Sequence, residues 1–544
     1  MPRVAGLLLC VGLAIHTPLA AAAATLLVHS KSDAGPGTLR QAIADNIGLG
    51  GGSTIVFSNT VTGTILLGTE LVISNNVTII GPGADSLVVS GNGVGRVFNL
   101  AGTATINISG LTITGGTTSF AGSGGGIFQQ SGTLILTGCV VTGNAIDHGN
   151  GAGMYAGGTV LASRCTFSVN ACYIGGGIYN DGSFTAINCT VAGNSGAIAA
   201  GGILSYGTLS LTSCTISGNR CSGGLIPIAG VYSGYITTIR NTIIAGNTGT
   251  ANPDCMGVFT SQGYNLIGAA NGSTGFNGIG DQTGSTNALL NAQLLPLANY
   301  GGSTPTMLPA PGSPALDQGT SAGLAIDQRG RPRPADNPNI INATLGDGSD
   351  IGAVEVGFGV TTTNDTVAGS LRQSILLANS NESLITFASN VVGTLTLTNG
   401  ALVISKDLAI VGPGARVLTL SAGTNGHVFE VLSGTVSMSG LTMANGRYVG
   451  NSGGFEQNGA EARGGGIFNQ TTLTLNSCVL SNNMVIGGQG GPTGSGFAGG
   501  GGNAANRSNE RHEREIAYLR RKWGPHLAVV QAKGTTRLVV RVAR

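Results

Sequence analysis

The sequence predicts an all-β protein built as a right-handed parallel β-helix, a β-solenoid with three short strands in each rung of roughly 25 residues. Three series of residues that recur with one period predict this fold. In each period a cysteine opens an apolar segment, an asparagine closes it, and a glycine-rich segment ending in an apolar pair follows. The series are Cys139, Cys165, Cys189 and Cys214; Asn144, Asn170, Asn194, Asn219 and Asn247; and the segments 124–128, 151–155, 175–179, 200–204 and 228–232.

The constant period predicts that equivalent side chains form files along a common axis. Rungs of a β-helix lie about 4.8 Å apart, which is the ordinary spacing of paired strands. Stacked cysteines have parallel side-chain vectors and are poorly placed for disulfides, so we expect a buried column of free thiols. We also expect the asparagines to form a hydrogen-bonded ladder. Other β folds fit less well, because propeller blades need about 40 to 50 residues and a calcium-binding β-roll needs an aspartate in each repeat.

Residues 1–24 read as a secretory signal peptide. Arg3 precedes an apolar run over 4–15, and small residues around 21–24 offer cleavage sites. The alternative is a signal anchor that is not cleaved. His16 and Pro18 argue against it, because they interrupt the apolar run. No other segment reaches the 18 or so apolar residues of a membrane helix, so we expect an exported mature chain without one, located in the medium or at the cell surface.

The first β-helix is expected over residues 25–299, with a capping helix near 38–46. Thr38 followed by Gln41 is the pattern of a capping box, and such a helix would cover the unpaired strand edges of the first rung. The same motif returns as "GSLRQ" after Gly369, about 330 residues later. Residues 357–502 are therefore expected to be a second, incomplete copy with its own capping helix.

Residues 300–356 form a proline-rich segment with the densest charge in the body of the chain. We expect a salt-bridged lid over the last rung, because arginine and carboxylate groups satisfy open strand ends. A metal or catalytic site is the alternative interpretation. The charged residues of its stretches 310–319, 326–334 and 347–355 are Asp317, Asp327, Arg329, Arg331, Arg333, Asp347, Asp350 and Glu355.

Three motifs of this closing segment, "PALD", "DQRGRPR" and "DIGAVE", resemble bacterial exported right-handed β-helix proteins of the choice-of-anchor Q domain type. The "G-x-L-R-Q" openings and the glycine-rich rungs are similar to the same group and, more weakly, to chlamydial polymorphic outer-membrane proteins. The resemblance implies a pectate-lyase-like superhelix at the cell surface, with no single activity. The parallel β-helix fold also hosts polysaccharide lyases and glycoside hydrolases, so an enzyme of this superfamily is the alternative to an adhesive or structural role.

The tail, residues 503–544, breaks the pattern of the rest of the chain. It holds ten Lys and Arg against three Glu, a net charge of +7, whereas the whole chain carries +2. A basic amphipathic helix over 509–523 is one interpretation. The other is a sequence foreign to the fold, such as a shifted reading frame, and the tail receives no functional role.

The rungs offer little for catalysis. Glycoside hydrolysis needs two carboxylates about 5 to 9.5 Å apart, but Asp147 and Asp181 have no acidic partner at the same position of a neighbouring rung. Asp147 with His148 as an acid–base pair competes with a solvated turn. We therefore predict no catalytic, cofactor-binding or metal-binding residue, no cofactor and no nucleic-acid partner, and expect an adhesin-like protein.

One repeated position carries aromatic residues, namely Phe128, Tyr155, Tyr179 and Tyr232, with Leu204 as the interruption. If the preceding residue points inward, these rings point outward and form a stripe. Such a stripe is either a platform for a cell-surface or extracellular polysaccharide or a set of rings that support the sheet by packing on one another.

Overall fold

The computed structural model describes most of the chain between residues 23 and 489 and two short segments near its end. The described residues are 23–118, 122–224, 227–250, 254–300, 302–337, 340–356, 358–367, 369–378, 383–388, 391–423, 426–455, 457–489, 527–532 and 535–540. The predicted signal peptide and most of the basic tail, including the helix considered over 509–523, lie outside the described residues. Among the described residues, no helix has the length and apolar character needed to cross a membrane.

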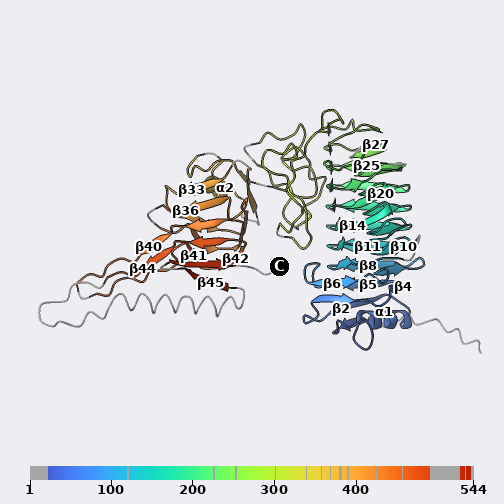
Figure 1. Cartoon of the computed structure of the whole chain (residues 1–544), viewed down its shortest axis with the longest axis horizontal. Helices are drawn as coiled ribbons and strands as arrows, with labels where there is room; N and C mark the ends of the chain where they lie inside the picture. The colour runs from blue at the N-terminus through green and yellow to red at the C-terminus, as the bar shows by residue number, and fades with distance from the viewer. Residues whose placement is uncertain are drawn as a thin grey trace, which may run out of the picture.

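The first part of the chain is a parallel β-helix, as predicted, with three faces (Figure 1). The first face contains β4 (Leu71–Ile73), β7 (Phe98–Leu100), β10 (Ile127–Gln129), β13 (Met154–Ala156), β17 (Ile178–Asn180), β21 (Ile203–Ser205), the start of β25 (Val231–Arg240), β27 (Cys255–Ser261) and β29 (Ser273–Thr274). The second face contains β1 (Thr25–Val28), β2 (Ser53–Phe57), β5 (Val77–Ile80), β8 (Thr105–Ser109), β11 (Thr133–Thr137), β14 (Thr159–Ser163), β18 (Ser183–Ile187), β22 (Thr208–Thr212) and the ends of β25 and β27.

The third face contains β3 (Gly63–Leu66), β6 (Leu87–Ser90), β9 (Thr112–Thr114), β12 (Val140–Thr142), β15 (Thr166–Ser168), β19 (Thr190–Ala192), β23 (Thr215–Ser217), β26 (Ile243–Ile244), β28 (Leu266–Ile267) and β30 (Gln282–Thr283). A short fourth sheet, β16 (Ala171–Ile174), β20 (Ser195–Ala199) and β24 (Arg220–Cys221), fills one corner of three rungs. All these pairs are parallel, and each rung repeats the pattern of the one below.

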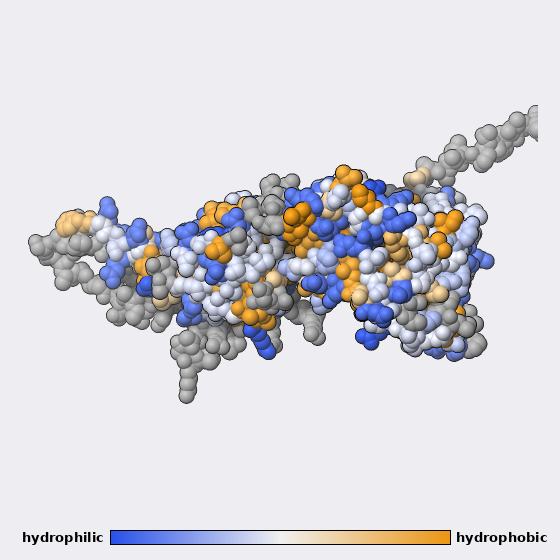
Figure 2. Space-filling model, turned by 90° about the horizontal axis from the view of Figure 1, so that it is seen from above, coloured by the Kyte–Doolittle hydropathy of each residue, from blue (hydrophilic) through white to orange (hydrophobic). Residues whose placement is uncertain are grey.

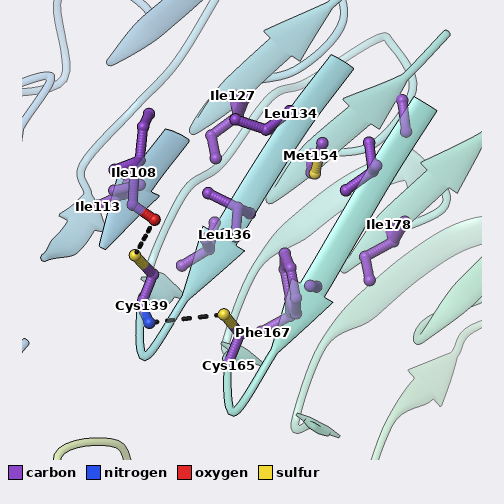
Figure 3. Packing of buried hydrophobic residues seen from close by; sticks show 14 of the residues in the cluster. Ile108, Ile113, Ile127, Leu134, Leu136, Cys139, Met154, Cys165, Phe167 and Ile178 are labelled. Atoms are coloured by element: carbon purple, nitrogen blue, oxygen red, sulfur yellow. Dashed lines mark hydrogen bonds between the residues drawn. The ribbon is translucent and has the colours of Figure 1, made fainter. Parts of the chain in front are cut away.

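The core of this solenoid is made of stacked identical positions. Ile178 pairs with Ile203, and both are fully buried. The predicted cysteine column is confirmed: the backbone N–H of Cys139 donates to Sγ of Cys165 at 3.5 Å, and that of Cys165 to Sγ of Cys189 at 3.4 Å (Figure 3). The eight cysteines of the described residues are free and buried, so the thiols act as small core residues and as hydrogen-bond acceptors for the turn.

The predicted asparagine ladder is also confirmed. Nδ2 of Asn170 donates to Oδ1 of Asn194 at 2.9 Å, and Asn194 donates in turn to Asn219 at 2.9 Å. The backbone N–H of each asparagine donates to the same Oδ1 of the next, as from Asn170 to Asn194 at 3.0 Å. The ladder ends at Asp254, whose Oδ1 accepts from Nδ2 of Asn247 at 2.9 Å. These buried amides satisfy backbone groups that the tight turns leave without strand partners.

A helix covers the first rung, as the capping box predicted. Helix α1 (Leu39–Gly48) begins after Thr38, whose Oγ1 accepts from the backbone N–H of Gln41 at 3.2 Å. The side chain of Gln41 donates to Asp45 instead of completing the box. Leu39 and Ile43 are buried against the core. The helix is thus held by half of the capping box and by its apolar face.

Arginine side chains fasten the capping helices to the first rungs. Arg40 forms an ion pair with Asp33 at 2.7 Å and donates to the backbone oxygens of Thr69 and Glu70. Arg372 repeats this in the second copy, with Asp365 at 2.9 Å. The arginine of the repeated "LRQ" motif therefore joins three chain segments, a role that was not predicted.

The closing segment lies along the flank of the first solenoid, and the prediction of a lid over its last rung is wrong. Gln328 accepts from Thr190 of β19 at 2.6 Å, and the N–H of Ala353 donates to Thr215 of β23 at 3.0 Å. The threonine-rich third face offers hydroxyl groups in register along several rungs, and the segment bonds to them. The expected salt bridges are present within the segment, Arg329 with Asp327 at 2.7 Å and Arg333 with Glu355 at 3.1 Å.

The second solenoid repeats the start of the first. After β31 (Phe358–Val360) and α2 (Leu371–Leu377), its strands are β32 (Ser383–Phe387), β33 (Gly393–Thr396), β34 (Leu402–Ser405), β35 (Leu408–Val411), β36 (Leu418–Ser421), β37 (Phe429–Ser433), β38 (Thr435–Ser439), β39 (Thr442–Ala444), β40 (Arg447–Val449), β41 (Ile467–Asn469), β42 (Thr472–Asn476), β43 (Val479–Ser481) and β44 (Met484–Ile486). The strands β45 (Leu527–Ala532) and β46 (Thr535–Val540) form an antiparallel pair, and β46 pairs with β43.

The closing segment fills the space between the two solenoids (Figure 1). Its Leu308, Leu316 and Val354 form one apolar cluster with Leu384 of β32 and Ala409 of β35. The two solenoids run in opposite directions, the first from α1 up to β27 and the second from α2 down to β42. The segment therefore joins them through its own core.

Candidate functional site

Five aromatic rings form a continuous file on the outer side of the first face, and we name this file the aromatic ribbon. It consists of Phe128, Tyr155, Tyr179, Tyr206 and Tyr232. The strand register places Phe128 beside Tyr155 and Tyr155 beside Tyr179. Side chains alternate between the two sides of a strand, so the inward position goes to the buried residue that precedes each ring, such as Ile127, Met154 or Val231. The outward orientation expected for this position is confirmed.

The lower rings of the ribbon stack face to face. Phe128 and Tyr155 have centroids 5.3 Å apart and planes 25° apart, and Tyr155 and Tyr179 have centroids 5.4 Å apart and planes 11° apart. Each ring is partly buried. Their faces are covered by their neighbours, so these rings support the sheet, as one of the two interpretations of the stripe expected, and present edges and hydroxyl groups outward.

The interruption at Leu204 is filled by a residue that the sequence interpretation missed. Leu204 is fully buried, and Tyr206, two residues later on the same side of the chain, takes its place in the file. Its centroid lies 6.0 Å from that of Tyr179 and 5.7 Å from that of Tyr232. Residues two apart along a strand lie on the same side. A tyrosine two positions after Leu204 is therefore the sequence signal that would have identified Tyr206.

Tyr206 also differs from the lower rings in orientation. Its plane is turned by 57° from Tyr179 and by 68° from Tyr232, and the residue is 44% exposed. A glycine at 234 makes room for it, because a Cβ there would lie 2.8 Å from Cδ1 of Tyr206 and 3.0 Å from Cε1 of Tyr232. The ribbon thus contains a turned, accessible ring between Tyr179 and Tyr232.

Three charged groups lie at the ribbon, namely Asp181, Arg96 and Glu70. Asp181, in an exposed turn, accepts a hydrogen bond from the hydroxyl of Tyr155 at 3.3 Å. Burial and the charge of Asp181 raise the pKa of Tyr155, and the same two effects, with smaller contributions from neighbouring tyrosines, raise the pKa of Tyr179 to about 12. At the other end, Arg96 lies 4.9 Å above the ring of Phe128 and pairs with Glu70 at 3.2 Å.

The second acidic candidate is separate from the ribbon's hydroxyl groups. Asp147 and His148 are both exposed in a turn, and the His148 ring lies 5.5 Å from Tyr173. The solvated-turn interpretation fits this position. Asp181 has Ala156 and Tyr206 as its neighbours on the adjoining rungs, through backbone hydrogen bonds of residues 180–181, and neither neighbour supplies the second carboxylate that glycosidases use.

The carboxylates of the closing segment serve its own backbone. Asp327 accepts from the backbone N–H groups of Arg329, Arg331 and Glu355 at 2.8 to 3.1 Å. Burial raises the pKa of Glu355 to about 7, although Arg333 opposes this, and burial likewise raises the pKa of Asp317 to about 7. In the part of the chain that the structure describes, no three His, Cys, Asp or Glu residues are arranged to hold a metal ion. The cluster orders the segment.

Comparison with known proteins adds one structural likeness. No protein-family model matches the chain, and no curated protein matches it. Among solved structures, the chain is similar to a mutant of the PL6 family alginate lyase AlyGC, with 12% sequence identity and a TM-score of 0.20, covering 84% of this chain and 76% of that one. The fold assignment rests on the strand register described above.

Proposed function

We propose that the protein is an exported structural or adhesive β-helix that binds polysaccharide through the aromatic ribbon. The observation that carries the proposal is the unbroken file of partly exposed rings from Phe128 to Tyr232. Solvent-exposed aromatic residues with hydroxyl groups supply both apolar contact and hydrogen bonds to a carbohydrate. The file follows the solenoid axis, so its shape suits a linear polymer.

The scaffold supports a binding role. Each ring is fixed by strand pairing below and above it, and the buried ladder and core beneath the first face hold the rungs at a constant spacing. A ligand therefore meets a surface that is already ordered, and binding does not have to pay for the ordering of loops.

Two features of the sequence support export to the cell surface or medium. One is the signal-like segment over residues 1–24, and the other is the resemblance of the closing motifs to choice-of-anchor Q domain proteins. A culture of the producing cells, fractionated into medium, surface and interior, tests this part. Detection only in the interior would contradict it.

Binding and cleavage can be separated by one experiment on the secreted chain. It is applied to a glycan array and then incubated with each bound polysaccharide, while reducing ends and unsaturated sugar ends are measured. We expect binding without release of either kind of end. Release of unsaturated or reducing ends would replace the adhesive role with that of a lyase or hydrolase.

A further inference from the structure

Within the ribbon, the plane of Tyr206 is turned by 57° from Tyr179 and by 68° from Tyr232. Tyr155 is stacked between Phe128 and Tyr179, and Arg96 lies over Phe128, whereas Tyr206 is turned away from both of its neighbours and is 44% exposed. A pyranose ring has faces made of C–H groups, which pack on an accessible aromatic ring. Tyr206 is therefore the point of the ribbon where a sugar ring can stack.

Below Tyr206 the ribbon offers hydrogen-bonding groups in place of ring faces. The exposed carboxylate of Asp181 accepts one bond from Tyr155, and a carboxylate has about four acceptor positions. The remaining positions suit the hydroxyl donors of a sugar, and bonds to a charged acceptor are stronger than neutral ones. A polyol chain meets both donors and acceptors here.

The charge at the ribbon selects against an anionic chain. Asp181 is the charged group whose field reaches the hydroxyls of both Tyr155 and Tyr179. The guanidinium of Arg96 is already paired with Glu70 and lies over Phe128, at the far end from Tyr206. A chain with a carboxylate on every sugar would place like charges next to Asp181, which is unfavourable.

Centroids along the ribbon are 5.3 to 6.0 Å apart, a spacing similar to the length of one sugar in an extended chain. We infer that the ligand is an extended, uncharged polysaccharide that lies parallel to the solenoid axis, with one sugar stacked on Tyr206 and its neighbours bonded to Asp181 and the tyrosine hydroxyls. This inference rests on the proposed function and names the class of its ligand.

The test measures the affinity of the full secreted chain for hexasaccharides of equal length by calorimetry. Cellohexaose and xylohexaose are the uncharged probes, and hexagalacturonate and a mannuronate hexamer are the charged ones. We expect the uncharged probes to bind at least tenfold more tightly. Tighter binding of the uronates would overturn the inference and leave the proposed function in place, whereas no binding of any probe would count against both.

Variants locate the site. Tyr206→Ala is expected to weaken binding of the uncharged probes about tenfold, while Tyr206→Phe keeps most of it because the ring remains. Tyr448 in the second solenoid is 40% exposed and provides a matched control, so Tyr448→Ala should leave binding unchanged. Equal losses in the Tyr206→Ala and Tyr448→Ala variants, both folded by circular dichroism, would overturn the inference.

Asp181→Asn tests the charge argument separately. The amide keeps an acceptor and removes the negative charge, so the affinity for the uronate hexamers should rise severalfold at low salt and converge with the wild-type value at high salt. An unchanged ratio of charged to uncharged affinity in this variant would contradict the electrostatic part of the inference.

Discussion

The two solenoids begin alike and then diverge. Both start with a helix capped by a hydroxyl, and in both an arginine fastens that helix to the first rung. In the first solenoid Thr159 pairs with Ser183, 24 residues on, whereas in the second Thr435 pairs with Thr472, 37 residues on. The longer rung has room for a protruding excursion.

The difference in rung length has its largest effect on the asparagine ladder. Asn483 accepts from the N–H of Gly446 at 2.8 Å, as Asn144 accepts from Gly116 at 2.9 Å. The first solenoid continues this through four more asparagines, and the second does not continue it among the described residues. The comparison indicates that a capping helix forms the first end of both solenoids, whereas the buried asparagine ladder requires short turns of constant length.

Removing a central ladder residue should have the largest effect on stability. Asn194→Ala leaves the buried backbone N–H of Asn170 without its acceptor and removes the side-chain hydrogen bonds to Asn170 and Asn219, which we expect to cost about 3 kcal/mol of unfolding free energy. The matched change Asn483→Ala affects one partly exposed rung and should cost about 1 kcal/mol. Chemical denaturation of both variants measures the difference. Equal costs would show that the ladder is not cooperative.

The stability of the closing segment and that of the second cap should depend on pH with opposite signs. The pKa of Asp317 in the closing segment is raised to about 7 by burial, so the folded state binds the proton more tightly than the unfolded state. Stability from this group is complete below the unfolded value near 4 and is lost as the pH rises to about 7, on the order of 4 kcal/mol. The protection factors for hydrogen exchange of residues 340–356, which correct for the rise of the intrinsic exchange rate with pH, should therefore be lower at pH 8 than at pH 5, and Asp317→Asn should reduce that change.

The second cap should respond in the other direction. Burial opposes the ionisation of Asp365, but the hydrogen bonds from Arg372, Thr398 and Asn399 outweigh it and lower its pKa. Its contribution is present above the unfolded value and disappears as the pH falls through the folded one. Protection factors for hydrogen exchange near α2 that stay constant between pH 6 and pH 3 would contradict this.

The arginine that fastens each cap should matter more in the second solenoid. Asp365 is almost fully buried beside Arg372, whereas Asp33 and Arg40 are each about a quarter exposed. Arg372→Ala should therefore cost about 2 kcal/mol, because it leaves a buried carboxylate unpaired, and Arg40→Ala about 1 kcal/mol. Thermal unfolding followed by circular dichroism provides the ranking, and the reverse order would contradict the burial argument.

One turn position should allow a small gain. The residue before a ladder asparagine has a positive φ, as in Gly193 at 67° and Gly218 at 69°, but Val169 occupies it at 55°. A β-branched residue is strained there, so Val169→Gly should stabilise the protein by about 1 kcal/mol. In the second solenoid Asn482 has φ 53°, and Asn482→Gly should change stability by only a few tenths of a kcal/mol, because asparagine tolerates this region.

The repeat period made the rungs, the cysteine column and the ladder predictable, because identical positions in a solenoid must stack. The flanking position of residues 302–356 was not predictable, since it depends on hydroxyls of Thr190 and Thr215 that look like ordinary strand residues. Tyr206 was missed for a related reason. It belongs to the ribbon through its place in space, two residues away from the repeated position.

The ladder also has a polarity. Every amide points its N–H toward the next rung, from Asn144 to Asn247, so the bond dipoles add in one direction, as they do in an α-helix. The row finishes on the carboxylate of Asp254, which accepts hydrogen bonds but has no N–H to pass on. Asp254, which takes the place of a further asparagine, thus puts a negative group at the positive end of the aligned dipoles and terminates the ladder.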